Sequence, residues 1–146
     1  MAGRINTSMP DYVVAKLARA LDERFHMGMN GACILLLGLA YKKNVDDLRE
    51  SPSMRLIEKF ERRGAMVDYH DRFIPVVPMT REHAALGGRE SVAWDLDRFA
   101  GYDAILVATD HDGVDYAAVA QVAKVVVDTS NACARAGADM SRVVMA

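Results

Sequence analysis

The stretch 33–52, which reads CILLLGLAYKKNVDDLRESP, constrains the fold of this chain more than any other. Residues 34–37 form a continuous apolar run closed by Gly38, which is the pattern of a strand buried on both faces of a parallel sheet. The residues that follow are polar and charged, so they predict a long loop. In open α/β sheets ligands bind outside the carboxyl ends of the strands. This loop therefore starts where a ligand site is expected.

A helix is expected directly after the loop. Ser51 is a good N-cap, and Pro52 fits the first helical position, where its missing N–H costs nothing. Gly64 is typical of a helix end. Between them, the apolar residues recur at a spacing that places them on one face of a helix. They are Met54, Leu56, Ile57 and Phe60.

Further strands and helices alternate along the chain. A single apolar stripe predicts a helix that opens at Met9-Pro10 and runs to about Phe25. Pro75 and Pro78 predict an extended excursion without regular structure, and 80–97 is ambiguous. Strands are expected at 65–69, 103–109 and 125–127, an edge strand at 142–145, and a short helix at 116–122. The alternation predicts an α/β fold with a doubly wound parallel sheet, Rossmann-like, preceded by an N-terminal helix.

Composition excludes some function classes. The 146 residues carry a formal net charge of −2, with a pI near 6.1, so there is no general electrostatic footprint for nucleic acid or for an anionic membrane surface. No apolar run approaches the roughly 20 residues that span a bilayer. Two cysteines, Cys33 and Cys133, do not suggest a disulfide framework. We expect a cytoplasmic protein.

The loop motif GLAYKKNVDDLRESP resembles the signature of the C-terminal domain of the UDP-glucose/GDP-mannose dehydrogenase family, the NAD-dependent nucleotide-sugar 6-dehydrogenases. Upstream, RINTSMPDYVV is similar to the family's segment leading into this domain, and GAMVDYHD and ATDH resemble its later strand ends. The resemblance implies that 1–29 end the central interdomain helical segment and that 30–146 form the C-terminal nucleotide-sugar-binding domain. From the residues alone, the first helix could equally be one that packs on its own sheet.

The resemblance also implies a reaction. The family oxidises the C6 alcohol of a nucleotide-linked sugar to a carboxylate, giving a UDP-uronic acid, with two NAD in succession and a cysteine nucleophile. Neither the family's GFGGxC type of motif nor a GxGxxG turn occurs here. We therefore expect no catalytic residue in this chain, NAD held mainly by an N-terminal domain of the same enzyme, and no activity of the fragment alone. The full-length enzyme is expected to be a homo-oligomer in polysaccharide biosynthesis.

Three loop residues are the candidate site. The ammonium groups of Lys42 and Lys43, just beyond a strand end, can neutralise a phosphate, and Tyr41 offers a flat face for a ring. From the residues alone, the alternative is a loop that is simply exposed to solvent. In the family, the motif's aromatic residue and first lysine touch the nucleotide sugar, which corresponds to Tyr41 and Lys42. The matching arginine reaches the NAD pyrophosphate, which makes Arg49 the cofactor candidate. Lys43 is then structural or solvent-facing.

Three positions depart from the family pattern. Asn44 stands where many relatives have an acid, and Arg72 replaces the proline of a usual D-P pair, so the turn is expected to differ. Ser130 stands where relatives carry an arginine assigned to the nucleotide, and a hydroxyl cannot make that bidentate contact. Arg135 is the nearby residue that could replace it. The substrate affinity or identity can therefore differ from the family norm.

Two other functions stay open. The pair His70-Asp71 and the run 110–112, DHD, are both expected at the same sheet edge, where they could bind a divalent metal for a hydrolase. Adjacent residues at a strand end usually point in different directions, which argues against such a site. Asp71 could instead bind a ribose hydroxyl. The remaining alternative is a standalone nucleotide-binding or interaction module without catalysis.

Overall fold

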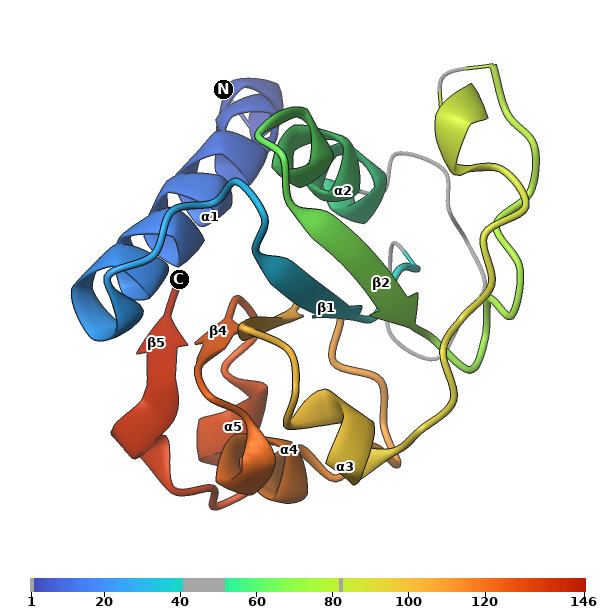
Figure 1. Cartoon of the computed structure of the whole chain (residues 1–146). Helices are drawn as coiled ribbons and strands as arrows, with labels where there is room; N and C mark the ends of the chain where they lie inside the picture. Colours follow the sequence, from blue (N-terminus) through green and yellow to red (C-terminus); the bar gives the residue numbers. More distant parts are fainter. Residues whose placement is uncertain (1, 41–51, 82) are drawn as a thin grey trace.

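A five-stranded, all-parallel sheet forms the centre of the protein (Figure 1). The computed structural model describes residues 2–40, 52–81 and 83–146. The strands follow the spatial order β2-β1-β3-β4-β5. Their bounds are β1 Cys33–Leu37, β2 Met66–His70, β3 Ala104–Val107, β4 Val126–Asp128 and β5 Val143–Met145. The predicted doubly wound parallel sheet is confirmed.

Helices cover both faces of the sheet (Figure 1). One face carries α1 (Ala2–Phe25) and α2 (Pro52–Arg62). The other carries three short helices, α3 (Leu96–Phe99), α4 (Tyr116–Val122) and α5 (Ala132–Arg135). Single 3-10 turns lie at Ala84–Leu86 and Met140–Arg142. The bounds of α4 match the prediction, whereas α5 was not predicted.

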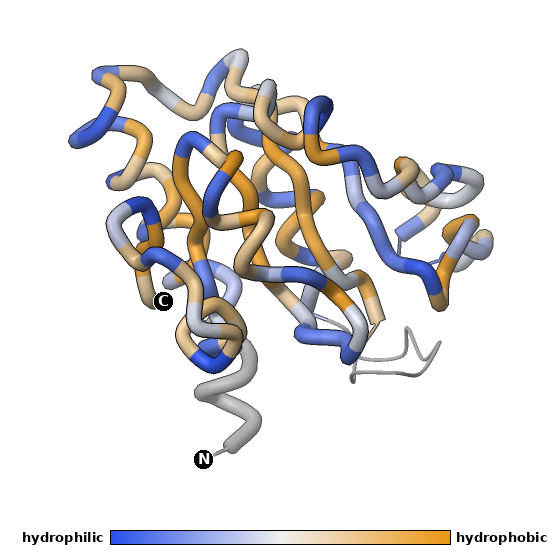
Figure 2. The backbone as a smooth tube through the Cα atoms, turned by 90° about the horizontal axis from the view of Figure 1, so that it is seen from below, coloured by the Kyte–Doolittle hydropathy of each residue, from blue (hydrophilic) through white to orange (hydrophobic). Residues whose placement is uncertain are grey.

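The apolar run of β1 is buried on both sides, as its sequence predicts. Ile34 and Leu36 pack in the core under α1 and α2, while Leu35 and Leu37 pack in the core above α3 and α4. Successive strand residues point to opposite faces, so a strand covered on both faces needs apolar residues at every position. Figure 2 shows the same pattern, with the apolar stretches of the backbone gathered in the middle of the molecule.

The first helix is longer than predicted. It begins at Ala2 and passes through Pro10, whereas the sequence placed its start at Met9-Pro10. Inside a helix a proline removes one backbone donor and its ring crowds the carbonyl four residues earlier, at a cost of about 3 kcal/mol, so α1 continues through Pro10 against a local penalty. Val13, Leu17 and Leu21 are buried in the core shared with α2 and the sheet.

None of the described helices is both long and apolar enough to cross a membrane.

The segment between β2 and α3 is the predicted irregular excursion. An isolated bridge joins Val76 to Glu90, and two side-chain contacts tie the segment to α2. His83 Nδ1 lies 2.8 Å from the Glu58 carboxylate, and Arg89 contacts both oxygens of Glu61 at 2.6 and 2.8 Å. The excursion is therefore held against the helix by side chains rather than by regular structure.

Candidate functional site

The carboxyl ends of β1, β2 and β3 meet at one edge of the sheet, and the candidate site lies there. In the order 2-1-3-4-5 the chain leaves β1 toward β2 on one side and reaches β3 on the other, so β1 and β3 flank the topological switch point. Ligands of open α/β sheets bind at this point. The predicted residues Tyr41, Lys42 and Arg49 all lie outside the described residues.

Gly38 brings the loops after β1 and β3 into contact. Its φ is +88°, and a Cβ at this position would lie 2.7 Å from the Cβ of Thr109 and 2.8 Å from its amide nitrogen. Only glycine adopts this conformation without strain and leaves that space open. The Thr109 hydroxyl donates to the Ala40 carbonyl at 2.6 Å, and the Thr109 amide donates to the Leu37 carbonyl at 3.2 Å. The start of the polar loop is thus fixed on the end of β3.

Asp71, directly after β2, fixes the same loop from the other side. One oxygen of its carboxylate accepts from the amides of Leu39 at 2.7 Å and Ala40 at 2.9 Å, and the other accepts from the amide of Phe73 at 2.9 Å. The imidazole Nε2 of His111 lies 2.9 Å from the first oxygen. The side chain is fully buried, so its carboxylate faces the protein interior. The ribose contact that the sequence left open for Asp71 is therefore not supported.

The contacts of Asp71 determine its charge state. Burial opposes the charged form, but the hydrogen bond from His111 and those from the amides of Ala40, Leu39 and Phe73 outweigh it and lower the pKa of the carboxyl. A carboxylate that accepts several amide N–H bonds is strongly stabilised in its charged form. Asp71 is therefore an ionised anchor of the sheet edge.

Asp128 has the corresponding role at the end of β4. Its buried carboxylate accepts from the amides of Ser130 and Cys133, both at 2.9 Å. Burial and the charge of Asp128 raise the pKa of the Cys133 thiol to about 12, so this buried cysteine is a thiol. The sequence analysis did not single out Asp128. The available signal was an acid directly after an apolar strand and before Thr-Ser-Asn, residues that favour turns.

Arg135 lies beside Ser130, as expected of a residue that could replace the family's arginine at position 130. Its guanidinium donates to the Ser130 carbonyl at 2.7 Å and to the Asn131 carbonyl at 3.2 Å, and it forms an ion pair with Asp110. The side chain is still 54% exposed. A guanidinium thus lies at the carboxyl end of β4, although a carboxylate already neutralises much of its charge.

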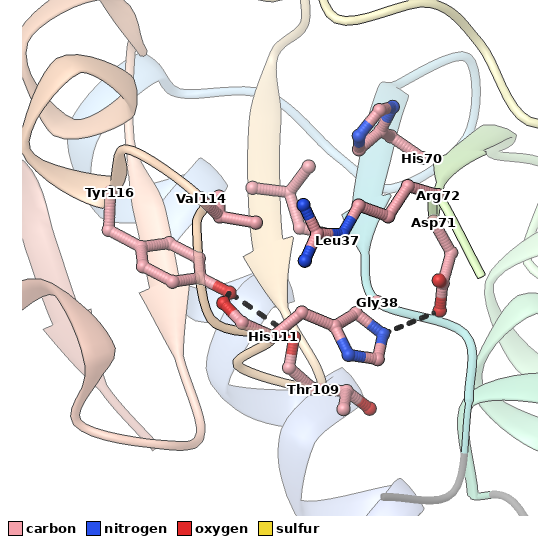
Figure 3. A pocket seen from close by; sticks show the side chains of 9 residues that line it. All are labelled: Leu37, Gly38, His70, Asp71, Arg72, Thr109, His111, Val114 and Tyr116. Carbon is pink, nitrogen blue, oxygen red and sulfur yellow. Dashed lines mark hydrogen bonds and ion pairs between the residues drawn. The ribbon is translucent and has the colours of Figure 1, made fainter. Parts of the chain in front are cut away.

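A small crevice opens between the ends of β1, β2 and β3, and we call it the edge crevice (Figure 3). It holds about 250 Å³ of free space, its open mouth included. Burial raises the pKa of Tyr116, whose hydroxyl donates at 3.4 Å to the carbonyls of Thr109 and His111. The lining residues are Leu37, Gly38, His70, Asp71, Arg72, Thr109, His111, Val114 and Tyr116.

The two acid and histidine clusters meet at this edge, as predicted, and in the described part of the chain the contact between them is the pair Asp71 and His111. Asp71 contacts His111, whereas His70 turns away so that its Nδ1 lies 2.7 Å from the Val92 carbonyl and its ring packs edge-on against Trp94. Among the described residues, no group of three or more His, Cys, Asp or Glu side chains is arranged to hold a metal ion. The expectation that neighbouring strand-end residues diverge holds for His70 and Asp71.

Comparison with known proteins places this geometry in context. Residues 35–135 match the model of the UDP-glucose/GDP-mannose dehydrogenase family, UDP binding domain. A UDP-N-acetyl-D-mannosamine dehydrogenase of Pyrococcus horikoshii is 32% identical over 111 residues, which cover 76% of this chain and 23% of that protein. A UDP-N-acetyl-D-glucosamine 6-dehydrogenase of Pseudomonas aeruginosa is 31% identical over 114 residues, or 76% and 25% of the two chains. The chain thus spans about a quarter of the length of these relatives.

Solved structures agree with the sequence matches. A UDP-D-ManNAc dehydrogenase from Pyrococcus horikoshii superposes with a TM-score of 0.69 at 28% identity, over 88% of this chain and 28% of that one. An NDP-N-acetyl-D-galactosaminuronic acid dehydrogenase from Methanosarcina mazei gives 0.74 at 23% identity, over 98% and 30%. The second likeness concerns the fold alone.

Proposed function

Since this chain belongs to the UDP-glucose/GDP-mannose dehydrogenase family and matches its UDP binding domain, we propose that it binds the nucleotide-sugar substrate of an NAD-dependent 6-dehydrogenase. The observation that carries the proposal is the position of the family's loop motif. The motif starts at Gly38, and hydrogen bonds with Asp71 and Thr109 hold its residue Ala40 at the switch point. It ends at Pro52, the first residue of α2. A ligand of this fold is expected at that edge.

The proposed reaction oxidises the C6 alcohol of a UDP-sugar to a carboxylate, giving a UDP-uronic acid, and NAD would accept the hydride. In this chain, Tyr41 would lie against the substrate and Lys42 would meet its charge or hydroxyls, while Arg49 would contact the NAD pyrophosphate. The chain would supply no catalytic nucleophile. The raised pKa of Cys133, to about 12, supports this point because a nucleophilic cysteine must be a thiolate.

The proposal extends to the protein that carries this domain. Residues 1–29 would end its central helical segment and 30–146 would form the nucleotide-sugar domain. An NAD-binding domain of the same enzyme would be the main partner, in a cytoplasmic homo-oligomer that acts in polysaccharide biosynthesis. The two free cysteines, Cys33 and Cys133, support a reducing compartment.

Steady-state kinetics of the dehydrogenase that includes this domain test the residue roles. Lys42→Ala should raise the KM for the UDP-sugar about tenfold or more, because a charged contact is lost, while Lys43→Ala, the adjacent control, should change it less than twofold. Arg49→Ala should raise the KM for NAD instead, with the exposed Arg55→Ala on α2 as its control. Unchanged kinetics in both Lys42→Ala and Arg49→Ala would refute the assignment.

A further inference from the structure

Arg72 places a guanidinium in the edge crevice (Figure 3). Its Cζ lies 4.9 Å from the ring centroid of Phe73, which is within the range of a cation–π contact. The Phe73 ring in turn packs on the His111 imidazole at 4.7 Å between centroids. His111 is buried and hydrogen-bonded to Asp71, so the Phe73 ring that contacts the guanidinium is anchored in the protein interior.

The chain after β3 leaves room for this guanidinium. Gly113 has a φ of +81°, and a Cβ there would lie 3.2 Å from Nη1 and 3.6 Å from Nη2 of Arg72. A side chain at position 113 would therefore crowd the guanidinium. Phe73 on one side and Gly113 on the other hold the arginine across the end of β1, between the ends of β2 and β3.

The charge of Arg72 has no acidic partner in the part of the chain that the structure describes, where none of the ion pairs includes it. The acids next to it are engaged elsewhere. Asp71 accepts three amides and contacts His111, and Asp110 is paired with Arg135. The guanidinium thus presents its N–H donors to the crevice and to solvent.

The size of the edge crevice limits its ligand. The space inside it that a water-sized sphere can occupy is only about 10 Å³, far below the roughly 300–1,000 Å³ of sites that enclose a whole small molecule, so most of the free space is its open mouth. A phosphate group is too large to enter the crevice, but it can meet the exposed guanidinium at the mouth, where the planar fork of arginine matches phosphate oxygens with two parallel hydrogen bonds.

We propose that Arg72 binds a phosphate group of the nucleotide diphosphate at the mouth of the edge crevice and so sets the affinity of this domain for its substrate. The proposal rests on the proposed function, since it takes the ligand to be a nucleotide, and it adds a residue outside the loop motif. Asp71 and Phe73 position the arginine without touching the ligand.

Isothermal titration calorimetry of the 146-residue chain with UDP, inorganic pyrophosphate and NAD tests this. Arg72→Gln should raise the dissociation constants for UDP and pyrophosphate about tenfold, because a charge-assisted contact is lost. Arg72→Lys should give an intermediate value, since an ammonium keeps the charge but not the fork. Arg62→Gln, which removes an exposed arginine on α2, is the matched control and should bind as the wild type does. Thermal unfolding without ligand checks that each variant is folded.

The outcomes separate the two proposals. Wild-type binding of UDP by Arg72→Gln, together with weakened binding by Lys42→Ala, would overturn the role of Arg72 and leave the proposed function standing. A loss confined to NAD in Arg72→Gln would also overturn it, because the contact would then be to the cofactor. A wild-type chain that binds neither UDP nor pyrophosphate would overturn both proposals.

Discussion

Asp71→Asn is the substitution that most directly tests how the candidate site is built. The carboxylate accepts from the amides of Leu39, Ala40 and Phe73 and contacts His111, all within 2.7–2.9 Å and fully buried. Asparagine keeps one acceptor oxygen and turns an NH₂ group toward at least one of these donors. The change removes the charge from the remaining bonds and leaves a buried N–H without an acceptor.

The magnitude follows from those contacts. A hydrogen bond to a charged acceptor contributes about 1.5–3 kcal/mol, against about 1 kcal/mol for a neutral one. A buried donor left without a partner costs about 1–3 kcal/mol, while the lower desolvation cost of a neutral side chain offsets part of the loss. We expect Asp71→Asn to lower the free energy of unfolding by about 3 kcal/mol at pH 7.

The effect must depend on pH in a defined direction. The folded-state pKa of Asp71 is lowered, so its stabilisation is fully present above the ordinary value of about 4 and is lost as the pH falls through the folded-state pKa. Urea unfolding at pH 7, 5 and 3 measures this, with the exposed Asp22→Asn on α1 as control. The difference between wild type and Asp71→Asn should shrink below about pH 4. A loss at pH 7 no larger than that of Asp22→Asn would refute the reasoning.

Three further predictions concern neighbouring features. Gly38→Ala should destabilise the chain by about 2 kcal/mol or more, because its Cβ would overlap Thr109 at a positive φ. Urea unfolding measures the loss, with the exposed Gly88→Ala as control, and equal losses in the two variants would contradict the prediction. The buried Cys133 thiol, with its pKa raised to about 12, should react with a disulfide reagent at pH 8 only upon unfolding, and rapid labelling of the native chain at this residue would show the burial to be wrong. Arg89→Gln should speed chymotrypsin cleavage within the excursion 71–95 several-fold, because it breaks the contact with Glu61. Cleavage no faster than in the control Arg81→Gln would contradict the claim that this contact holds the excursion against α2.

The sequence predicted the elements whose burial is uniform or strongly periodic. Residues 34–37 are apolar at every position because the strand is covered on both faces, and α2 begins at Pro52 and is followed by Gly64 at a φ of +92°, as expected. The short helix α5, Ala132–Arg135, was missed because four residues make one turn, too few to show a period. The early start of α1 was missed because proline is tolerated in the first turn of a helix and is unfavourable inside one, so Pro10 indicated a helix start.

The sequence predicted which strand ends meet at the sheet edge, whereas the predicted site residues Tyr41, Lys42 and Arg49 lie outside the described residues. The clusters around Asp71 and His111 were expected at one sheet edge, and they meet there. Which way each side chain points could not be read from the sequence, because neighbouring residues at a strand end diverge and loop amides decide which carboxylate turns inward. Arg72 was noticed as a departure from the family pattern, but its position over Phe73 and beside Gly113 depends on loops from two different strands.

Thermal unfolding of this chain with UDP, GDP or NAD at millimolar concentration, and without ligand, tests the central claim most directly. A ligand at about 100 times its dissociation constant stabilises the folded state by about 2.7 kcal/mol, which a domain of this size reports as a shift of several degrees. The account predicts a shift with UDP that is larger than those with GDP and NAD. No shift with UDP, or a larger one with NAD, would contradict the claim that this chain is a UDP-sugar-binding domain.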